Sequence, residues 1–456
     1  MPRTGPTVKS KPPSQNPQLA EARFRKMTAA QMTARRAGPL QGVVRAPGDK
    51  SISHRALILG ALARGLTEVE GLLEGEDVKA SAAAMAAFGA GVERLGEGKW
   101  RVVGRGGFSE PADVVDCGNA GTGVRLIMGA AAGFDLAATF TGDASLRGRP
   151  MNRVLKPLGE MGASWVCRAG GRLPLTLKGG NLKHIAYRLP EPSAQVKSAV
   201  LFAGLFAERG VTVVEEAIPT RDHTERMLQR AGVPVDRRPG YVGISPVREL
   251  VLPEIAVPGD FSSAAPFIAA ATILQGSSLT LRDISINPTR TGMLAVLERM
   301  GARVGLFRRR LAAGEPVADI EVRPAELVAT DIEAEIVPTL IDELPLMVLL
   351  ASFARGTTTI RGAGELRVKE SDRISTVVEL LNTCGGHVTA LPDGFEVLGV
   401  PHRLRGGRVD AAGDHRIAML GAIVGVCSQE GVTVEGADAL GVSFPDFADR
   451  LAAVVA

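Results

Sequence analysis

The sequence predicts an α/β (α+β) protein of two similar domains, each made of three copies of one unit around a pseudo-threefold axis. The first observation is size, because 456 residues with 45% hydrophobic content can bury more than one core. The second is a pattern of a donor-rich turn, an apolar helix, a β-branched strand, a polar loop, a second helix and a further strand, which returns six times. The third is its spacing of 66 to 80 residues, which is too long for the common helical solenoids.

The six units can be followed in order along the chain. Their turns begin near Pro47, Cys117, Pro192, Pro258, Pro338 and Ala412. Strands rich in β-branched residues follow the first helices at 67–72, 211–216, 278–283, 357–362 and 432–437. The second helix of each unit ends in a segment with apolar residues at helical spacing followed by small residues. These segments are 83–94, 155–166, 225–236, 294–305 and 377–388, and the last copy is 447–456. Residues 292–304 have the spacing of a surface helix with one buried face. Six unrelated helix–strand segments would be the alternative.

Positive charge is concentrated at the N-terminus. Residues 1–38 hold eight basic residues against the single acid Glu21, whereas the whole chain carries a net charge of +4, so the body is net negative. This segment is polar and lacks apolar periodicity, which predicts a disordered basic extension. A true start at Met27 or Met32 is the alternative. Nucleic acid is disfavoured as a partner, because the body is acidic and the chain has only two Trp and two Tyr for base stacking.

The remaining composition favours the reducing cytoplasm. The longest apolar stretches, such as 264–274 and 417–427, are shorter than the roughly 18 to 20 residues that span a bilayer. Four cysteines are widely separated, fit no metal-ligand spacing and are too few to cross-link a chain of this size: Cys117, Cys167, Cys384 and Cys427. We therefore expect a protein without a membrane segment or disulfide framework.

The turns before the first helices carry many hydrogen-bond donors and cations. Residues 47–65 place a lysine, serines and an arginine ahead of a helix, whose first turn leaves backbone N–H groups free for an anion. If the units fold alike, their turns meet in a ring of cations that suits a small ligand with several negative charges. The turns contain Lys50, Arg55, Asn119, Arg125, Ser193, Gln195, Lys197, Asp342, Glu343, His415 and Arg416, and the loops add Arg149, Arg221, Arg290, Lys369 and Arg373. For any single arginine, a solvated surface position or an interdomain ion pair is the simpler interpretation.

Two carboxylates in these loops have the chemistry of proton-transfer groups. Asp342, and Glu370 beside Lys369, could exchange protons with a ligand if one closed pocket holds them together. Charge balance among the cations is the alternative, and Glu370 with Asp372 could equally favour a helix start.

Six segments carry a family resemblance. They are PGDKSISHRALILGALA, DCGNAGTGVRL, GDASLRGRPM, SAQVKSAVL, RVKESDRI and GDHRIAM, in this order across roughly residues 40 to 450. Together they resemble the 5-enolpyruvylshikimate-3-phosphate (EPSP) synthase family, and the variants PGDKSISHR, SAQ and TRDHTE resemble its divergent bacterial class. The resemblance implies two domains, each of three βαβαββ units. We expect 39–46 with 258–456 in the first and 47–257 in the second, with a hinge near 45–47 and 256–259 that closes on the ligands.

The resemblance also implies a reaction without a metal or organic cofactor. The 5-hydroxyl of shikimate 3-phosphate attacks C2 of phosphoenolpyruvate while C3 is protonated, and the adduct then expels phosphate. Asp342 is expected to be the base for the hydroxyl, and Glu370 with Lys50 the groups that handle the other protons. The residues expected to hold shikimate 3-phosphate are Lys50, Ser51, Arg55, Ser193, Ala194, Gln195, Arg221, Asp342 and Lys369. Those expected around phosphoenolpyruvate are Lys50, Gly121, Arg149, Gln195, Glu370, Arg373 and Arg416. The expected protein is a cytoplasmic monomer of the shikimate pathway to chorismate and the aromatic amino acids.

Two positions depart from the family pattern. Ser443 stands where many members have a lysine, so the phosphoenolpyruvate contact of that lysine is absent unless another cation such as Arg290 replaces it. Gly121 stands where the divergent class often has alanine, whose methyl crowds glyphosate in the phosphoenolpyruvate site. We therefore expect sensitivity to glyphosate.

Two other functions remain as alternatives. The sister enolpyruvyl transferase that acts on UDP-N-acetylglucosamine shares the fold, but it has a reactive cysteine five residues before the arginine that corresponds to Arg149. That position is Ala144 here, and Cys117 lies in another loop. A catalytically inactive sugar-phosphate binding protein is the second alternative, against which Asp342, Glu370 and Lys50 argue.

Overall fold

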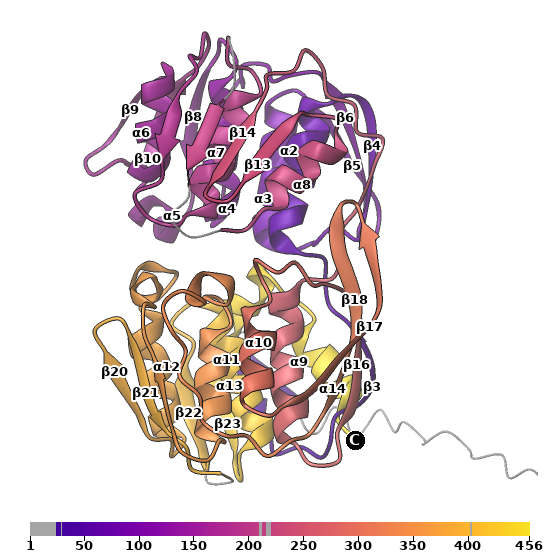
Figure 1. The fold of residues 1–456 in the computed structure, drawn as a ribbon, viewed down its shortest axis with the longest axis vertical. Coiled ribbons are helices and arrows are strands. Elements are labelled where there is room, and N and C mark those ends of the chain that lie inside the picture. The colour runs from indigo at the N-terminus through magenta and orange to yellow at the C-terminus, as the bar shows by residue number, and fades with distance from the viewer. Residues whose placement is uncertain (1–23, 29, 209–211, 216–219, 402–403) are drawn as a thin grey trace, which may run out of the picture.

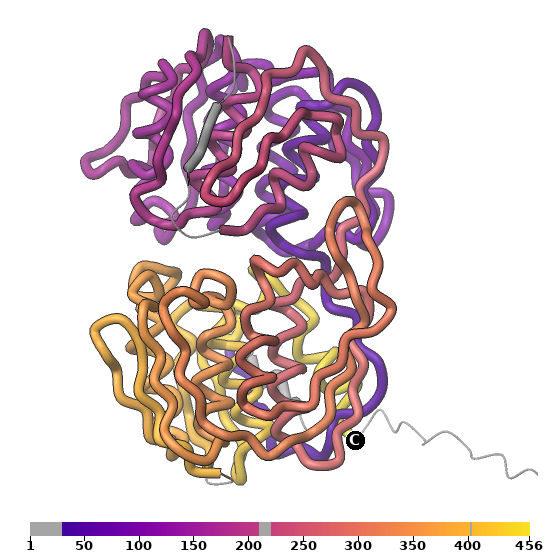
Figure 2. The backbone as a smooth tube through the Cα atoms, viewed as in Figure 1, coloured from indigo at the N-terminus to yellow at the C-terminus, as the bar shows by residue number. Residues whose placement is uncertain are grey.

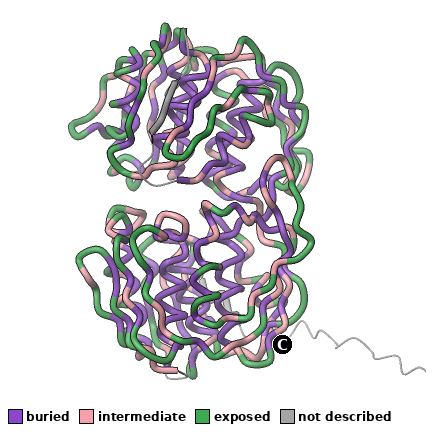
Figure 3. The backbone as a smooth tube through the Cα atoms, in the orientation of Figure 1, coloured by how far each residue is buried: buried purple, intermediate pink, exposed green. Residues whose placement is uncertain are grey.

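The computed structural model describes residues 24–28, 30–208, 212–215, 220–401 and 404–456, which form two stacked domains joined along one side (Figure 1). Buried apolar side chains form two clusters, one within residues 52–257 and the other within 32–44 and 261–454. Figure 3 shows buried positions along the chain in both domains. The two-domain α/β fold predicted from the sequence is confirmed. We propose the boundaries 39–46 with 258–456, and 47–257, because the gaps between the two clusters fall at these points.

The second unit shows the arrangement that recurs. It contains β7 (Val115–Asp116), α4 (Gly121–Ala132), β8 (Ala137–Thr141), α5 (Ala144–Gly148), α6 (Asn152–Met161), β9 (Ser164–Arg168) and β10 (Arg172–Lys178). Its sheet has the order β7-β8-β10-β9, with β7 parallel to β8 and with β10 antiparallel to both of its neighbours. The first helix thus connects two parallel strands, and a second helix and a hairpin follow.

The first and third units complete the upper domain. The first contains α2 (Lys50–Leu62), β4 (Arg64–Glu70), α3 (Glu76–Ala87), β5 (Gly91–Gly96) and β6 (Lys99–Arg105). The third contains β11 (Ala186–Arg188), α7 (Ala194–Gly204), β12 (Thr212–Glu215), α8 (His223–Arg230), β13 (Val235–Arg238) and β14 (Tyr241–Ile244). The parallel partner of β4 is β15 (Glu254–Ala256), which follows the third unit in sequence.

The lower domain repeats the same plan. The fourth unit contains β3 (Gln41–Arg45), α9 (Phe261–Ile273), β16 (Ser278–Ser285), α10 (Gly292–Arg299), β17 (Arg303–Ala312) and β18 (Glu315–Arg323). The fifth contains η1 (Val337–Thr339), α11 (Leu344–Ser352), β19 (Thr357–Ile360), η2 (Gly364–Val368), α12 (Arg373–Thr383), β20 (Val388–Leu391) and β21 (Gly394–Leu398). The sixth contains β22 (Gly406–Asp410), α13 (His415–Cys427), β23 (Gly431–Glu435), η3 (Ala437–Val442) and α14 (Phe447–Val454). The surface helix predicted over 292–304 is α10, which buries one face but ends at Arg299, and residues 303 and 304 begin β17.

The expectation that residues 1–38 are disordered is wrong for their C-terminal part. β1 (Phe24–Thr28) and β2 (Gln31–Ala34) form a hairpin, and β2 pairs antiparallel with β23, so they supply the hairpin of the sixth sheet. Met32 and Ala34 are buried in the lower core, and Gln31 Nε2 donates to Glu435 Oε1 at 2.8 Å. Burial of the apolar positions of this alternating strand stabilises the pairing. The remaining basic residues of 1–23 lie outside the described part.

The first helices of the units occupy the interior of each domain. In the lower domain, α9, α11 and α13 pack against one another, and every residue of α9 is buried. In the upper domain α4 packs against α2 and α7, and it approaches α7 so closely that a Cβ on Gly129 would lie 2.4 Å from the carbonyl oxygen of Ala199. Beyond their polar first turns these helices are therefore mainly apolar, as interior helices must be.

The chain passes between the domains twice on the same side (Figure 2). The two crossovers bond to each other, because Asp49 N donates to Pro258 O and Asp260 N donates to Pro47 O, both at 2.8 Å. Gly48 is required here, since a Cβ at this position would lie 1.9 Å from the carbonyl oxygen of Gly71. These two crossover segments lie where the sequence predicts a hinge.

Candidate active site

A cavity of about 340 Å³ lies between the domains, where the first helices of all six units begin. Its wall includes the N-terminal residues of α2, α4, α7 and α13, together with Asp260 and Asp342 just before α9 and α11. Free N–H groups and the positive ends of helix dipoles therefore converge on it. Among the described residues, nine lysines and arginines and five carboxylates line the wall. This excess of cations is the arrangement that a multiply charged anion requires.

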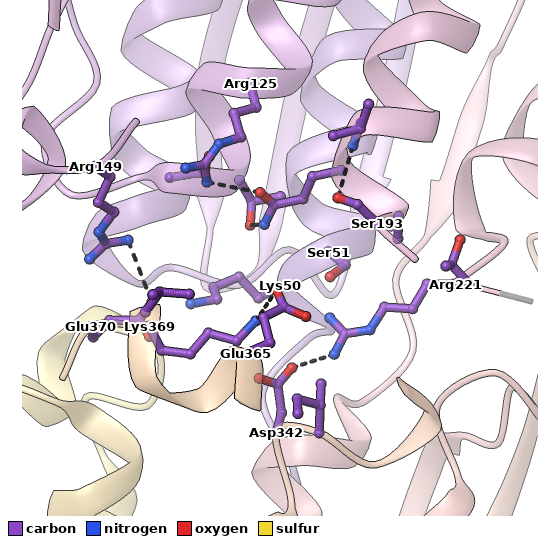
Figure 4. A pocket seen from close by; sticks show the side chains of 18 of the residues that line it. Lys50, Ser51, Arg125, Arg149, Ser193, Arg221, Asp342, Glu365, Lys369 and Glu370 are labelled. Carbon is purple, nitrogen blue, oxygen red and sulfur yellow. Dashed lines mark hydrogen bonds and ion pairs between the residues drawn. The ribbon is translucent and has the colours of Figure 1, made fainter. Parts of the chain in front are cut away.

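The N-terminus of α2 places Lys50 and Ser51 in the cavity (Figure 4). Asp49 caps this helix by accepting from Ile52 N at 2.9 Å, which fixes the direction of the first turn. Lys50 Nζ donates to Asp77 Oδ2 at 3.3 Å, and Asp77 is itself buried at the start of α3. The ammonium group is thereby held at the wall rather than free in the solvent.

The α4 and α7 side of the cavity is a network of amides and guanidinium groups. Arg125 Nη1 donates to Gln195 Oε1 at 2.9 Å, and Gln195 Nε2 donates to Thr122 Oγ1 at 3.0 Å. Gly121 lies next to the guanidinium group of Arg149, since a Cβ on Gly121 would be 2.9 Å from Arg149 Nη1. Ser193 caps α7, and Ala194 is part of the wall. The backbone and side chains here offer a rigid set of donors.

Asp342 lies among cations from both domains. Arg221 of the upper domain pairs with its Oδ2 (Figure 4). Arg416 Nη2 lies 3.5 Å from the same oxygen, and Arg373 Nη1 lies 3.4 Å from Oδ1. Burial acts to raise the pKa of Asp342, but the charges of Arg416, Arg221 and Lys369 outweigh it and hold this pKa well below its usual value. Asp342 is therefore an anion at neutral pH.

Glu370 is the second carboxylate that the structure brings into the cavity. Arg373 Nη2 donates to its Oε2 at 2.6 Å, and Arg149 of the upper domain lies 3.6 Å from Oε1 (Figure 4). Burial acts to raise its pKa, but Arg373, Lys50 and Arg149 together hold the pKa well below the ordinary value. Lys369 projects into the same space and donates to Glu365 Oε1 at 2.9 Å.

All but one of the predicted substrate-contact residues line this one cavity, and the exception is Arg55. Its guanidinium is buried behind the wall, where it donates to Thr224 Oγ1 and Ser198 Oγ at 2.7 Å and to Ser51 O at 2.9 Å. Desolvation lowers the pKa of Arg55 to about 10, so it stays charged at neutral pH. In this structure Arg55 supports Ser51 instead of facing the cavity.

The residue at the family's lysine position does not face the cavity either. Ser443 is buried and is not part of the lining. Arg290 does line the cavity, but its guanidinium is bound to Ser262 and lies 3.4 Å from Asp260 Oδ1. Arg290 is thus partly neutralised by its own domain.

Several cavity residues have no signal in the sequence. Asp77, Thr122, Asp260 and Glu365 line the wall, yet each is a common residue at a helix start or in a loop. Asp260 could have been found only from its place in the fourth unit, as the residue immediately before α9, where it matches Asp49 before α2. Their roles depend on contacts that no local pattern records.

Asp260 gives the fold an expected pH dependence. Burial and the neighbouring Asp49 raise the pKa of Asp260 to about 6. Between pH 4 and 6 the folded state thus binds more protons than the unfolded state, and the free energy of unfolding decreases as pH rises through this window. In the wild type we expect the free energy of unfolding to fall by about 1 to 3 kcal/mol through this window because of Asp260. Asp260→Asn keeps the helix cap and is expected to abolish this fall, measured by urea unfolding from pH 4 to 7. The exposed Asp438→Asn is the control, and equal slopes for all three proteins would contradict the assignment.

Comparison with known proteins assigns a family to this fold and cavity. The family model for EPSP synthase (3-phosphoshikimate 1-carboxyvinyltransferase) matches residues 34–451. The 3-phosphoshikimate 1-carboxyvinyltransferase of Phenylobacterium zucineum is 59% identical over 93% of this chain and 95% of its own, and that of Caulobacter vibrioides is 54% identical over 93% and 98%. A solved EPSP synthase from Acinetobacter baumannii is 39% identical, with a TM-score of 0.85 over 93% of this chain and 98% of its own. The enolpyruvyl transferase NikO from Streptomyces tendae, 17% identical with a TM-score of 0.73, shares the fold.

Proposed function

This chain belongs to the EPSP synthase (3-phosphoshikimate 1-carboxyvinyltransferase) family, and from that premise we propose that the cavity between its domains is the place of reaction. The enzyme transfers the enolpyruvyl group of phosphoenolpyruvate to the 5-hydroxyl of shikimate 3-phosphate and releases phosphate, a step of aromatic amino acid biosynthesis. The observation that supports this cavity most is the excess of cations where six helix N-termini meet. Two substrates that each carry phosphate and carboxylate groups need such a set, and clamping both turns a bimolecular addition into an oriented one.

We assign shikimate 3-phosphate to the α2, α7 and Asp342 side. Ser51, Ser193, Gln195, Arg221 and Lys369 would donate to its phosphate, hydroxyl and carboxylate groups. Asp342 would accept the proton of the attacking 5-hydroxyl, because a carboxylate held as an anion is ready to do so. Arg221 and Arg416, which now pair with Asp342, would also orient that carboxylate.

We assign phosphoenolpyruvate to the side of Gly121, Arg149, Glu370 and Arg416. Glu370 is an anion without ligands, so it must take up a proton before it can deliver one to C3. Binding of an anionic substrate beside it would raise its pKa and favour that uptake, since like charges disfavour the ionised form. Lys50 would supply or accept the proton in elimination of phosphate, and the fixed cations would stabilise the adduct.

We also propose the oligomeric state, the location and the partners of the enzyme. We propose a monomer, because one chain supplies both walls of the cavity within the described residues. We propose the cytoplasm as its location, because all four cysteines are free thiols. In that same part of the chain, no helix has the length and apolar character to cross a membrane. The chemistry proposed needs only side chains and the two substrates, which are the partners we expect.

The UDP-N-acetylglucosamine alternative lacks its nucleophile. Position 144 is alanine, at the start of α5. Cys117 is buried outside the cavity lining, and burial raises its pKa to about 12, so its thiolate is not available near neutral pH.

The test of the function is phosphate release by the purified protein. We expect release only when shikimate 3-phosphate and phosphoenolpyruvate are both present. Each substrate alone is the control, and UDP-N-acetylglucosamine with phosphoenolpyruvate is the competing pair. Release with that competing pair alone, or with none, would overturn the assignment.

Gly121 is expected to set sensitivity to glyphosate. In Gly121→Ala the new methyl would lie 2.9 Å from Arg149 Nη1 and 3.4 Å from Arg125 Nη1, so it would displace the guanidinium groups that hold phosphoenolpyruvate. We expect the wild type to be inhibited at submillimolar glyphosate, and the variant to show a roughly tenfold rise in the inhibition constant, equivalent to ~1.4 kcal/mol. Gly148→Ala, whose methyl would have nothing within 4 Å, is the control. A wild-type rate untouched by submillimolar inhibitor would contradict the expectation.

A further inference from the structure

Six consecutive polar residues of the upper domain, 220–225 (TRDHTE), lie at the boundary with the lower domain, at the edge of the cavity. Five of them are buried, and Arg221 alone is partly exposed. Such a run of polar side chains can be buried only if each one is hydrogen-bonded or ion-paired. The partners of this segment lie in two directions.

Two of its residues are held by the lower domain. Asn287 Nδ2 donates to Asp222 Oδ1 at 2.6 Å and to Glu315 Oε2 at 3.0 Å. His223 Nδ1 donates to Glu315 Oε1 at 2.8 Å, and all four of these side chains are fully buried. Asn287 follows β16 and Glu315 begins β18, and the β17–β18 hairpin reaches from the lower domain toward α8 in Figure 1.

The rest of the segment faces the cavity wall. Arg221 crosses to Asp342 (Figure 4). Thr224 Oγ1 accepts from Arg55, which in turn supports Ser51. Glu225 pairs with the buried Lys197 at 2.7 Å, and Lys197 Nζ donates to the carbonyl oxygen of Thr220 at 3.4 Å. The cavity residues at 220 and 221 are thus joined to α7 on one side and, through residues 222 and 223, to the lower domain on the other.

A buried network of this kind has one well-satisfied geometry. Asp222 also accepts from Arg226 Nε at 2.9 Å and pairs with Arg237, and these bonds with that of Asn287 hold its pKa below the ordinary value in spite of burial. A shift of Asn287 or Glu315 would leave buried donors or carboxylates without partners, which is costly. The position of the neighbouring Arg221 is therefore coupled to the positions of Asn287 and Glu315.

We propose that Glu315 and Asn287 are positioning residues, which act on the substrate through Arg221 by holding Asp222 and His223 across the domain boundary. The inference rests on the proposed role of Arg221 in binding shikimate 3-phosphate. It makes the placement of that guanidinium depend on the lower domain as well as on the core of its own domain.

The test is Glu315→Gln. A glutamine has one acceptor oxygen in place of two, so either the His223 Nδ1–H or the Asn287 amide loses its acceptor. We expect KM for shikimate 3-phosphate to rise roughly tenfold, with KM for phosphoenolpyruvate changed by less than about twofold. Glu321→Gln is the matched control, because Glu321 lies on the same strand and, among the described residues, has an ion pair only with the exposed Arg323. Equal KM values in Glu315→Gln and the control would overturn the proposal.

The same substitution in an Arg221→Ala background separates positioning from loss of fold. If Glu315 acts through Arg221, the added substitution changes KM no further, whereas a general effect on the fold raises KM by the same factor in both backgrounds and overturns the proposal. If Glu315→Gln does not fold, Glu315→Asp, which keeps the charge and withdraws the carboxylate by one methylene, carries the same comparison. A wild type that releases no phosphate would instead refute the proposed function, and titration of shikimate 3-phosphate into wild type and variants by calorimetry would still test the positioning.

Discussion

Glu370→Gln is expected to lower kcat by about 10² to 10⁴-fold, the usual contribution of a positioned proton-transfer group. The glutamine keeps the shape of the side chain and its acceptor for Arg373, but it cannot carry a proton to C3 of phosphoenolpyruvate. KM for shikimate 3-phosphate is expected to change little, because Glu370 lies on the side of Arg149.

The rate of phosphate release at saturating substrates measures this effect. Glu379→Gln, on the exposed face of α12, the helix that begins three residues after Glu370, is the control and is expected to retain the wild-type rate. A Glu370→Gln enzyme within about threefold of wild type would leave Lys50 as the sole proton carrier and contradict the role given to Glu370.

The fold is largely predictable because the signal is repeated. The five expected β-branched strands overlap β4, β12, β16, β19 and β23, and the first helices follow the expected turns. The N-terminal hairpin could not be predicted in the same way. β2 has only four residues, two of them apolar, and its partner β23 lies about 400 residues further along the chain. Long-range pairing, not local propensity, orders this strand.

The cavity follows from the same repetition, whereas its internal contacts do not. Equivalent turns must meet when equivalent units pack around one axis, so the sequence predicts which cations converge. It cannot predict that Arg55 turns inward to Thr224 and Ser198, because those partners lie on α8 and α7. A motif also does not show whether an arginine contacts a ligand or forms an ion pair within the protein. Among these arginines, Arg373 is the one whose substitution is expected to have the largest effect on stability and activity.

Arg373 is predicted from sequence as a phosphoenolpyruvate contact, but the structure also makes it the centre of a buried charge network. Its guanidinium donates to Asp414 Oδ2 at 2.7 Å and to Glu370 Oε2 at 2.6 Å, and it lies 3.4 Å from Asp342 Oδ1, with only 1% of its side chain exposed. Removal of one partner from a buried ion pair leaves uncompensated charge in the interior. Arg373→Met is therefore expected to lower the free energy of unfolding by about 3 to 5 kcal/mol at pH 7 and to abolish activity.

The sign of the pH dependence distinguishes this explanation from lost packing. Arg373 lowers the pKa values of Glu370 and Asp414, so the stability it supplies is present above their unfolded values near pH 4 and is lost as pH falls through the folded values. Urea unfolding is thus expected to show a difference between wild type and variant that shrinks as pH is lowered from 7 to below 4. Arg323→Met, which breaks an exposed pair with Glu321, is expected to cost at most about 1 kcal/mol. A difference for Arg373→Met that is independent of pH would mean that the side chain contributes by packing alone, and that the carboxylates of the active site are held ionised by the remaining cations.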